Sequence, residues 1–154
     1  SSLIGELPLG VPENLVPYLT QTAIGKRECL TVFGNDYKTR DGTCIRDYIH
    51  IMDLAEVHVI CLEKIMRVKS DNFFKVYNVG TGKGSSVLEL INLFETVNQI
   101  KLNYKIGARR KGDVVTAYAN TSKIEGELDW RTKYSLEDAL KSAWRWQKNI
   151  NKNE

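Results

Sequence analysis

The run GNDYKTRDGTCIRDYIHIMDLAEVH, residues 34–58, joins a turn-rich loop to a helix through one short extended segment. Gly, Asn and Asp suit the turns of the loop, and β-branched Thr43 and Ile45 favour a strand. Asp53 is the expected N-cap of the helix, with Glu56 three residues later as its capping-box partner. Arg46 lies between the strand and the helix. Its planar guanidinium offers paired donors and keeps its charge, so it suits a phosphate group.

Outward from this run, helices and strands alternate along the chain, which predicts the α/β class. Leu30–Phe33, 74–79 and 102–106 have the pattern of short strands. One helix is expected over 12–25, and others begin at Asp53, Ser86, Ser122 and Ser135. In the helix from Asp53, the spacing predicts burial of Leu54, Val57, Cys61, Leu62 and Ile65.

Composition narrows the kind of partner. The chain has 154 residues, the size of about one domain, and a net charge of only +3. Its densest basic stretch, 101–111, lacks interleaved aromatic residues and any nucleic-acid motif, so a small anionic ligand is favoured over nucleic acid. No apolar run reaches the ~20 residues that would span a membrane. Three cysteines without Cys-x-x-Cys spacing predict reduced thiols in a cytoplasmic protein and no zinc or other metal site.

Several motifs in the same order resemble the carboxy-terminal part of the UDP-glucose 4-epimerases, which belong to the extended short-chain dehydrogenases/reductases. The matching motifs are 14–15 with 17–18, 32–37, 46–50, 77–80 and 109–113. The resemblance implies a substrate-binding region over 1–154, with small mixed sheets plus helices. Most of the Rossmann sheet would be absent, its one late strand falling near 74–79. The NAD-binding region would lie upstream of Ser1.

The same resemblance implies a nucleotide-sugar site. Arg46 and Arg110 would bind the diphosphate, although a solvated surface position is the usual fate of arginine. Asp113 would bind the ribose, or else be a turn aspartate beside Gly112. Phe33 would stack on uracil rather than join the core, with main-chain contacts to the base from Thr31 and Val32.

The remaining members of the implied site are less defined. Asn14 and Leu15 match contacts to the sugar and phosphate at a helix start, where free amides favour anions. Val87 would line the nucleotide pocket. Tyr48 is as much a packing residue as a ligand contact. Ala117 takes the place of a residue that closes the sugar end of the pocket, where a small side chain accompanies acceptance of N-acetylated sugars; otherwise it is simply a small strand residue.

The loop Gly80–Gly84 invites a phosphate-binding interpretation, because glycines after a strand let amides approach an anion. Ser85 stands where the last glycine of the dinucleotide fingerprint would be, so a structural turn is favoured. His50 is expected to be structural. The catalytic Tyr-x-x-x-Lys of the resembling family is absent, and no catalytic residue is therefore expected in this chain.

The resemblance implies the substrate-binding half of an enzyme of galactose metabolism that interconverts UDP-glucose and UDP-galactose with NAD. Interconversion of their N-acetylated counterparts is a further expectation. The whole enzyme would be a cytoplasmic homodimer joined through the upstream region. The alternatives are a sibling sugar-nucleotide epimerase or decarboxylase, and a catalytically inactive UDP-sugar-binding fragment. Alone, the chain should be inactive and prone to associate, because its helices would expose apolar faces.

Overall fold

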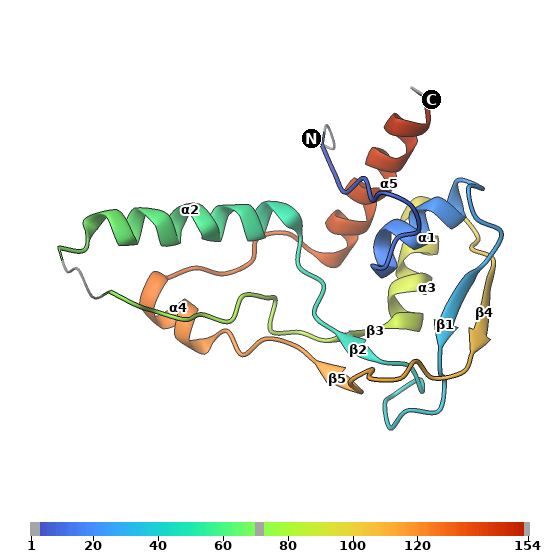
Figure 1. Cartoon of the computed structure of the whole chain (residues 1–154), viewed down its shortest axis with the longest axis horizontal. Helices are drawn as coiled ribbons and strands as arrows, with labels where there is room; N and C mark the ends of the chain where they lie inside the picture. The colour runs from blue at the N-terminus through green and yellow to red at the C-terminus, as the bar shows by residue number, and fades with distance from the viewer. Residues whose placement is uncertain (1–3, 70–72, 153–154) are drawn as a thin grey trace.

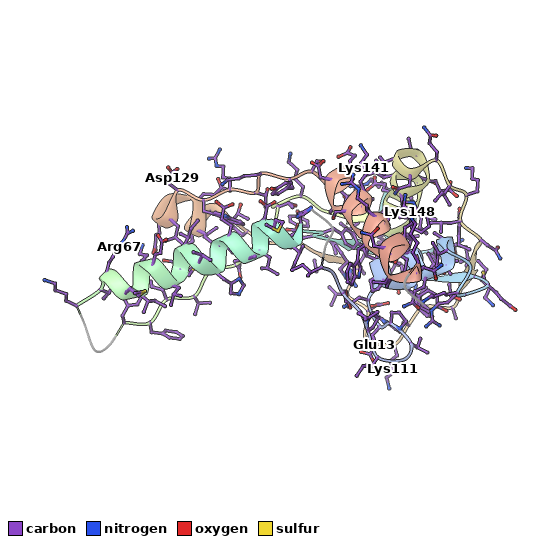
Figure 2. The ribbon with its side chains drawn as sticks, turned by 90° about the horizontal axis from the view of Figure 1, so that it is seen from above. Glu13, Arg67, Lys111, Asp129, Lys141 and Lys148 are labelled. Atoms are coloured by element: carbon purple, nitrogen blue, oxygen red, sulfur yellow. The ribbon has the colours of Figure 1, made fainter. Side chains whose placement is uncertain are left out.

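The computed structural model describes residues 4–69 and 73–152. The molecule is elongated (Figure 1): α1, α3, α5 and a two-stranded sheet form a compact end, and α2 with α4 forms an arm. The helices are α1 (Leu15–Ala23), α2 (Ile51–Arg67), α3 (Val87–Asn98), α4 (Ser122–Leu128) and α5 (Leu136–Lys152). Figure 2 shows Arg67 and Asp129 at the far end of the arm, well away from Lys111 and Lys148.

Two small sheets connect these helices. In the first, β1 (Leu30–Phe33) pairs in parallel with β4 (Tyr104–Gly107). In the second, β2 (Ile45–Arg46) lies between antiparallel β3 (Ser85–Ser86) and parallel β5 (Thr116–Ala117). Small mixed sheets with helices are the fold class predicted from the sequence, and that prediction is confirmed.

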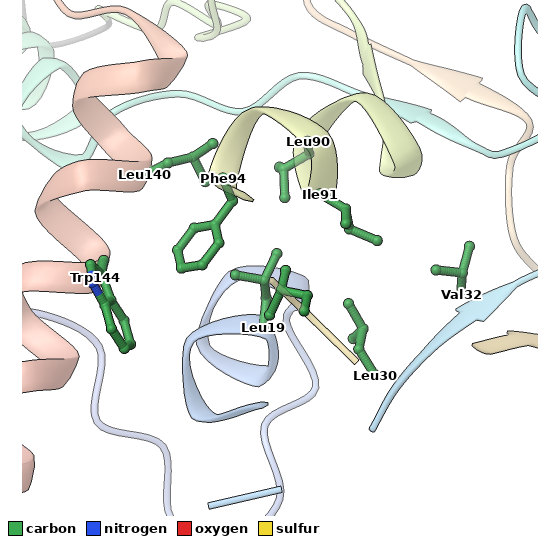
Figure 3. Packing of buried hydrophobic residues seen from close by; sticks show 9 residues of the cluster. Leu19, Leu30, Val32, Leu90, Ile91, Phe94, Leu140 and Trp144 are labelled. Atoms are coloured by element: carbon green, nitrogen blue, oxygen red, sulfur yellow. The ribbon is translucent and has the colours of Figure 1, made fainter. Parts of the chain in front are cut away.

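The main core lies at the compact end (Figure 3). Helices α1, α3 and α5 turn their apolar stripes toward one another and toward β1, as their three- and four-residue spacing predicts. Its buried members are Leu19, Leu30, Val32, Leu90, Ile91, Phe94, Leu102, Leu140 and Trp144. Phe94 meets Trp144 edge to face, with 5.9 Å between ring centroids.

Helix caps at this end follow the sequence pattern. Ser86 accepts a hydrogen bond from the Glu89 amide, and the Glu89 carboxylate accepts one from the Ser86 amide, so the predicted capping box of α3 is confirmed. Ser135 and Asp138 make the same reciprocal pair at the start of α5. Hydrogen bonds to Ser135 hold the pKa of Asp138 below its usual range.

The start of α2 differs from the prediction. The helix begins at Ile51, with His50 as N-cap, because the His50 ring nitrogen Nδ1 accepts a hydrogen bond from the Met52 amide at 3.0 Å. Asp53 is fully buried inside the first turn and accepts hydrogen bonds from the amides of Lys133 and Tyr134. The expected role of Asp53 as N-cap is therefore wrong, and the expected structural role of His50 is confirmed.

The arm has a small core of its own, in which Val57 of α2 packs with Ile124 and Trp130. Leu62 and Ile65 were expected to be buried, but their side chains are more than half exposed. The expected strand near 74–79 is not formed either: residues 73–79 have no regular secondary structure. The segment instead contacts α4, where the Tyr77 hydroxyl donates to Glu127 at 2.8 Å.

Candidate functional site

Strand β2 positions the first arginine. Ile45, the β-branched residue before Arg46, pairs with strands on both edges, and the ladder sets Arg46 opposite Ser85 of β3 and Ala117 of β5. The Ile45 amide donates to the Val115 carbonyl at 2.9 Å, which fixes the register with β5. The two-residue strands therefore bring Arg46 and Ala117, 71 positions apart in the numbering, side by side.

Arg46 and Arg110 converge on Asp113. Nη2 of Arg110 lies 2.8 Å from Asp113 Oδ1, and Nη2 of Arg46 lies 3.4 Å from the same oxygen. Gly112 adopts φ +88°, which turns the chain so that Asp113 comes back under Arg110. The Asp113 side chain is 10% exposed and that of Arg110 is 59% exposed. Two guanidinium groups thus share one carboxylate at an accessible surface.

Phe33 completes this cluster from the end of β1. Its side chain is 45% exposed, and the Arg110 guanidinium carbon lies 5.8 Å from its ring centroid. Val32 points into the main core, and Thr31 is half-buried beside Gly107. Because Val32 is buried, its side chain is not available to a ligand. We call Phe33, Arg46, Arg110 and Asp113 the arginine cluster.

The other predicted site residues are not part of the arginine cluster. Ala117 is exposed beside Arg46. Val87 follows β3 and packs on the main core, as do Leu15 and Tyr48. Burial raises the pKa of Tyr48 to about 12, against the opposing effect of the Arg46 charge, so its hydroxyl stays protonated. Asn14 is the N-cap of α1, but its side chain donates to Glu6 at 3.0 Å rather than capping the helix.

Arg109 has a structural role that the sequence did not reveal. Its Nε donates to Asp36 Oδ1 at 2.7 Å, and its guanidinium carbon lies 4.2 Å from the Tyr37 ring centroid. This hydrogen bond lowers the pKa of Asp36. Arg109 thereby holds the turn that contains Arg110 against the loop that follows β1. The two adjacent arginines are visible in the sequence, but nothing in the residues around them indicates that Arg109 is the one that pairs with the loop after β1.

The glycine loop after residue 79 is occupied by a side chain of the protein itself. Asp47 Oδ2 accepts hydrogen bonds from the amides of Thr81, Gly82 and Ala119 at 3.0, 3.1 and 3.2 Å. These main-chain amides could have bound a phosphate, but they donate to the Asp47 carboxylate instead. This geometry supports the interpretation of the loop as a structural turn.

Two surface hollows lie outside the arginine cluster. One, of about 600 Å³, is lined by residues of α3 and the chain after it. The other, of about 480 Å³, lies between α2 and α4. Within 4–69 and 73–152, the structure holds no group of three or more His, Cys, Asp or Glu side chains suited to a metal ion. None of the helices described there is long and apolar enough to cross a membrane.

Comparison with known proteins gives the family. The family model described as GDP-mannose 4,6 dehydratase matches residues 6–143. UDP-glucose 4-epimerase of Bacillus subtilis is 49% identical over 152 residues, covering 98% of this chain, and the human enzyme of that name is 49% identical over 148 residues. The chain belongs to the UDP-glucose 4-epimerase family. It spans 44% and 42% of the length of those two relatives and corresponds to their carboxy-terminal part.

Solved UDP-glucose 4-epimerases have the same architecture. The Stenotrophomonas maltophila enzyme, described with bound NAD and formylated UDP-arabinopyranose, superposes with a TM-score of 0.94 at 40% identity, over 99% of this chain and 45% of that one. The Bifidobacterium longum enzyme, described in complex with NAD+ and UDP, gives 0.90 at 40% identity, over 99% of this chain and 44% of that one. The family and fold class predicted from the motifs are therefore confirmed.

Proposed function

We propose that this chain is the substrate-binding part of an NAD-dependent UDP-glucose 4-epimerase, which interconverts UDP-glucose and UDP-galactose in galactose metabolism. The arginine cluster would bind the nucleotide: Arg46 and Arg110 on the diphosphate, Asp113 on the ribose and Phe33 on uracil. Thr31 and Val32 would offer main-chain contacts, Asn14, Leu15 and Tyr48 would flank the ligand, and Val87 would line the pocket. The whole protein would be a cytoplasmic homodimer.

The observation that carries this proposal is the convergence of Arg46 and Arg110 on one carboxylate. Two guanidinium groups held within 3.4 Å of the same oxygen match the doubled charge of a diphosphate. Phe33 beside Arg110 offers an aromatic face to a base. Such a ligand would displace Arg110 from Asp113 and leave the carboxylate free to accept hydrogen bonds from ribose hydroxyls.

The chain alone should not catalyse epimerisation. The hydride step belongs to the NAD cofactor, which requires a binding site of its own. This sequence has neither a complete dinucleotide fingerprint nor a Tyr-x-x-x-Lys to supply the base. In the proposed division of labour, these residues therefore bind and orient the UDP-sugar, and other residues of the enzyme hold NAD and move the proton.

Arg110→Ala should weaken binding of UDP to the full-length protein by an order of magnitude or more, because a hydrogen bond to a charged group contributes roughly 1.5–3 kcal/mol. Isothermal titration calorimetry with UDP measures this directly. Arg131→Ala is the matched control, since Arg131 is also an exposed arginine paired to a carboxylate, that of Glu125. Equal affinities of Arg110→Ala and the wild type would refute the diphosphate site.

A broader substrate range is a second candidate, and the exposed Ala117 favours it. Its side chain leaves open space beside Arg46, where an acetamido group could fit. A solved relative, described as the UDP-Glc/GlcNAc 4-epimerase of Campylobacter jejuni, is 38% identical with a TM-score of 0.76. We propose that the whole enzyme also interconverts UDP-N-acetylglucosamine and UDP-N-acetylgalactosamine.

A further inference from the structure

We propose that Asp47 is a positioning residue that sets the spacing of the nucleotide-sugar site, an inference that rests on the proposed function. Asp47 follows Arg46 directly, so its side chain leaves the chain on the opposite side of the extended segment. There it contacts two segments remote in sequence, the turn at 80–82 and the residue Ala119 beyond β5. One carboxylate therefore links these two segments to the stretch that carries Arg46.

The contacts of Asp47 are numerous for one half-buried side chain. Oδ1 accepts from the amide and the hydroxyl of Thr81 at 2.9 and 2.6 Å. Oδ2 accepts from the Gly82 and Ala119 amides as well as from Thr81. Hydrogen bonds to an ionised acceptor are about twice as strong as neutral ones. These bonds therefore hold the turn and β5 firmly at a fixed distance from β2.

The strands need this support because they are short. β2 pairs with β3 and with β5 over only two residues each. Such brief ladders provide few main-chain hydrogen bonds to resist sliding. Ala119 lies two residues beyond Ala117, so the bond from its amide to Asp47 fixes the strand that faces Arg46. Loss of that bond should let Arg46 and β5 shift relative to each other.

Gly80 makes room for the carboxylate. A methyl group at this position would lie 2.3 Å from Asp47 Oδ2 and 2.7 Å from the Ala119 side chain. Its backbone angle is one that other residues adopt, so the lack of space is the reason for glycine here. Gly80→Ala should therefore displace Asp47 without changing any charge, which makes it an independent test of the same role.

Charge and position predict opposite effects for Asp47→Asn. If Asp47 were merely a carboxylate near an anion site, its neutralisation would strengthen UDP binding, because like charges repel. If Asp47 positions Arg46 and β5, the NH2 group of asparagine would replace an oxygen that accepts from main-chain amides, and UDP binding would weaken. The sign of the change therefore separates the two roles.

The experiment measures the dissociation constant for UDP by calorimetry on the full-length protein, at two salt concentrations and below the unfolding temperature of each variant. Asp47→Asn and Gly80→Ala should each weaken binding by about tenfold, since a small misplacement of a binding group is costly. Their UDP affinity should also depend less on salt than that of the wild type, because a displaced Arg46 contributes less charge.

Two variants control for general destabilisation. Asp53→Asn removes a fully buried carboxylate that, like that of Asp47, accepts from main-chain amides, but at the base of the arm. Gly126→Ala adds a methyl group where nothing lies within 4 Å. Both should bind UDP within twofold of the wild type. Unchanged or tighter binding by Asp47→Asn and Gly80→Ala, or an equal loss in Asp53→Asn, would overturn the positioning role.

The outcome also distinguishes this inference from the proposed function. If Arg110→Ala loses UDP affinity while Asp47→Asn and Gly80→Ala bind normally, the arginine cluster stands and the positioning role falls. If the wild-type protein gives no saturable heat with UDP, the proposed function falls and takes the positioning role with it. Should Asp47→Asn fail to fold, Gly80→Ala decides the question, because it preserves every charge.

Discussion

At the scale of single residues, Ala117 gives the most specific prediction about which sugars the enzyme accepts. It is exposed on β5 beside Arg46, and Thr116, its neighbour on the same strand, is also exposed. Successive side chains of a strand point to opposite faces, so only one of the two can border the site. A substitution that changes activity at one of these positions and not at the other therefore acts through the site rather than through the strand.

Ala117→Tyr should abolish interconversion of the N-acetylated UDP-sugars by the full-length enzyme while sparing UDP-galactose, because the ring would fill the space for an acetamido group. The measurement is turnover of both substrate pairs. Thr116→Tyr, on the opposite face, should leave both activities within a few-fold of the wild type. Equal loss of both activities in Ala117→Tyr, or a wild type inactive on acetamido sugars, would exclude Ala117 as the gate.

Residues in local motifs could be predicted, and residues whose partners are remote could not. Arg46, Arg110 and Asp113 stand in recognisable runs, and the structure brings them together as predicted. Asp47 stands in the same run, yet its partners lie 34 and 72 positions away. No sequence pattern connects those positions, because hydrogen bonds to main-chain amides do not depend on the identity of the donor residue.

At the scale of elements, the start of α2 shows how tertiary contacts override a local signal. Asp53 with Glu56 has capping-box spacing, but the chain after α4 supplies two amides to the Asp53 carboxylate and draws it inside the helix. The cap passes to His50, whose ring stacks on Tyr134 with 4.4 Å between centroids. The boxes of α3 and α5 were predictable because the Glu89 and Asp138 carboxylates keep their bonds to the amides of Ser86 and Ser135, even though Arg40 also donates to Glu89.

The histidine cap makes stability depend on pH. Burial lowers the pKa of His50, outweighing the carboxylates of Asp53 and Asp138, and the Nδ1 that accepts from Met52 must be unprotonated. Because the unfolded chain binds the proton more readily, stability is complete above about pH 6.5 and falls as the pH drops through the lowered pKa. Chemical denaturation at pH 7.5 and 5.5 should show this loss, up to about 1 kcal/mol for a disrupted cap.

The matched variant is His50→Asn, which keeps a capping acceptor but has no proton to gain. Its free energy of unfolding should change less over the same pH interval. The carboxyl groups whose pKa is lowered, such as Asp36 and Glu89, titrate below this interval and do not interfere. The same pH dependence in both proteins would show that His50 is not the titrating group.

At the scale of the whole molecule, the arm leaves one helix face open. Val59, Leu62 and Met66 recur at three- and four-residue spacing along α2, and Ile51 lies eight residues before Val59. Ile51, Val59, Leu62 and Met66 are 63%, 55%, 57% and 78% exposed. Phe74, beyond the helix, is 82% exposed. A continuous apolar stripe of this kind is characteristic of an interface rather than of a free surface.

The 154-residue chain on its own should therefore associate with itself. Leu62→Glu combined with Met66→Lys should shift it toward monomer in sedimentation velocity and reduce binding of a hydrophobic dye, with stability altered by less than about 0.5 kcal/mol. Lys141→Glu, on the exposed surface of α5, is the control and should change neither property. A strictly monomeric wild type with a sharp cooperative unfolding transition would contradict the prediction.

The way the main core is closed has a consequence for the order of synthesis on the ribosome. Trp146 of α5 donates to the carbonyl of Glu6 at 3.0 Å, and Gln147 accepts from Thr20 of α1 at 3.2 Å. Helix α1 is therefore made before α5, the helix that completes its packing. Until α5 leaves the exit tunnel, Leu19 and Phe94 of the nascent chain cannot pack against Trp144. Apolar surface exposed in this way makes a folding intermediate prone to aggregate, which a chaperone counteracts.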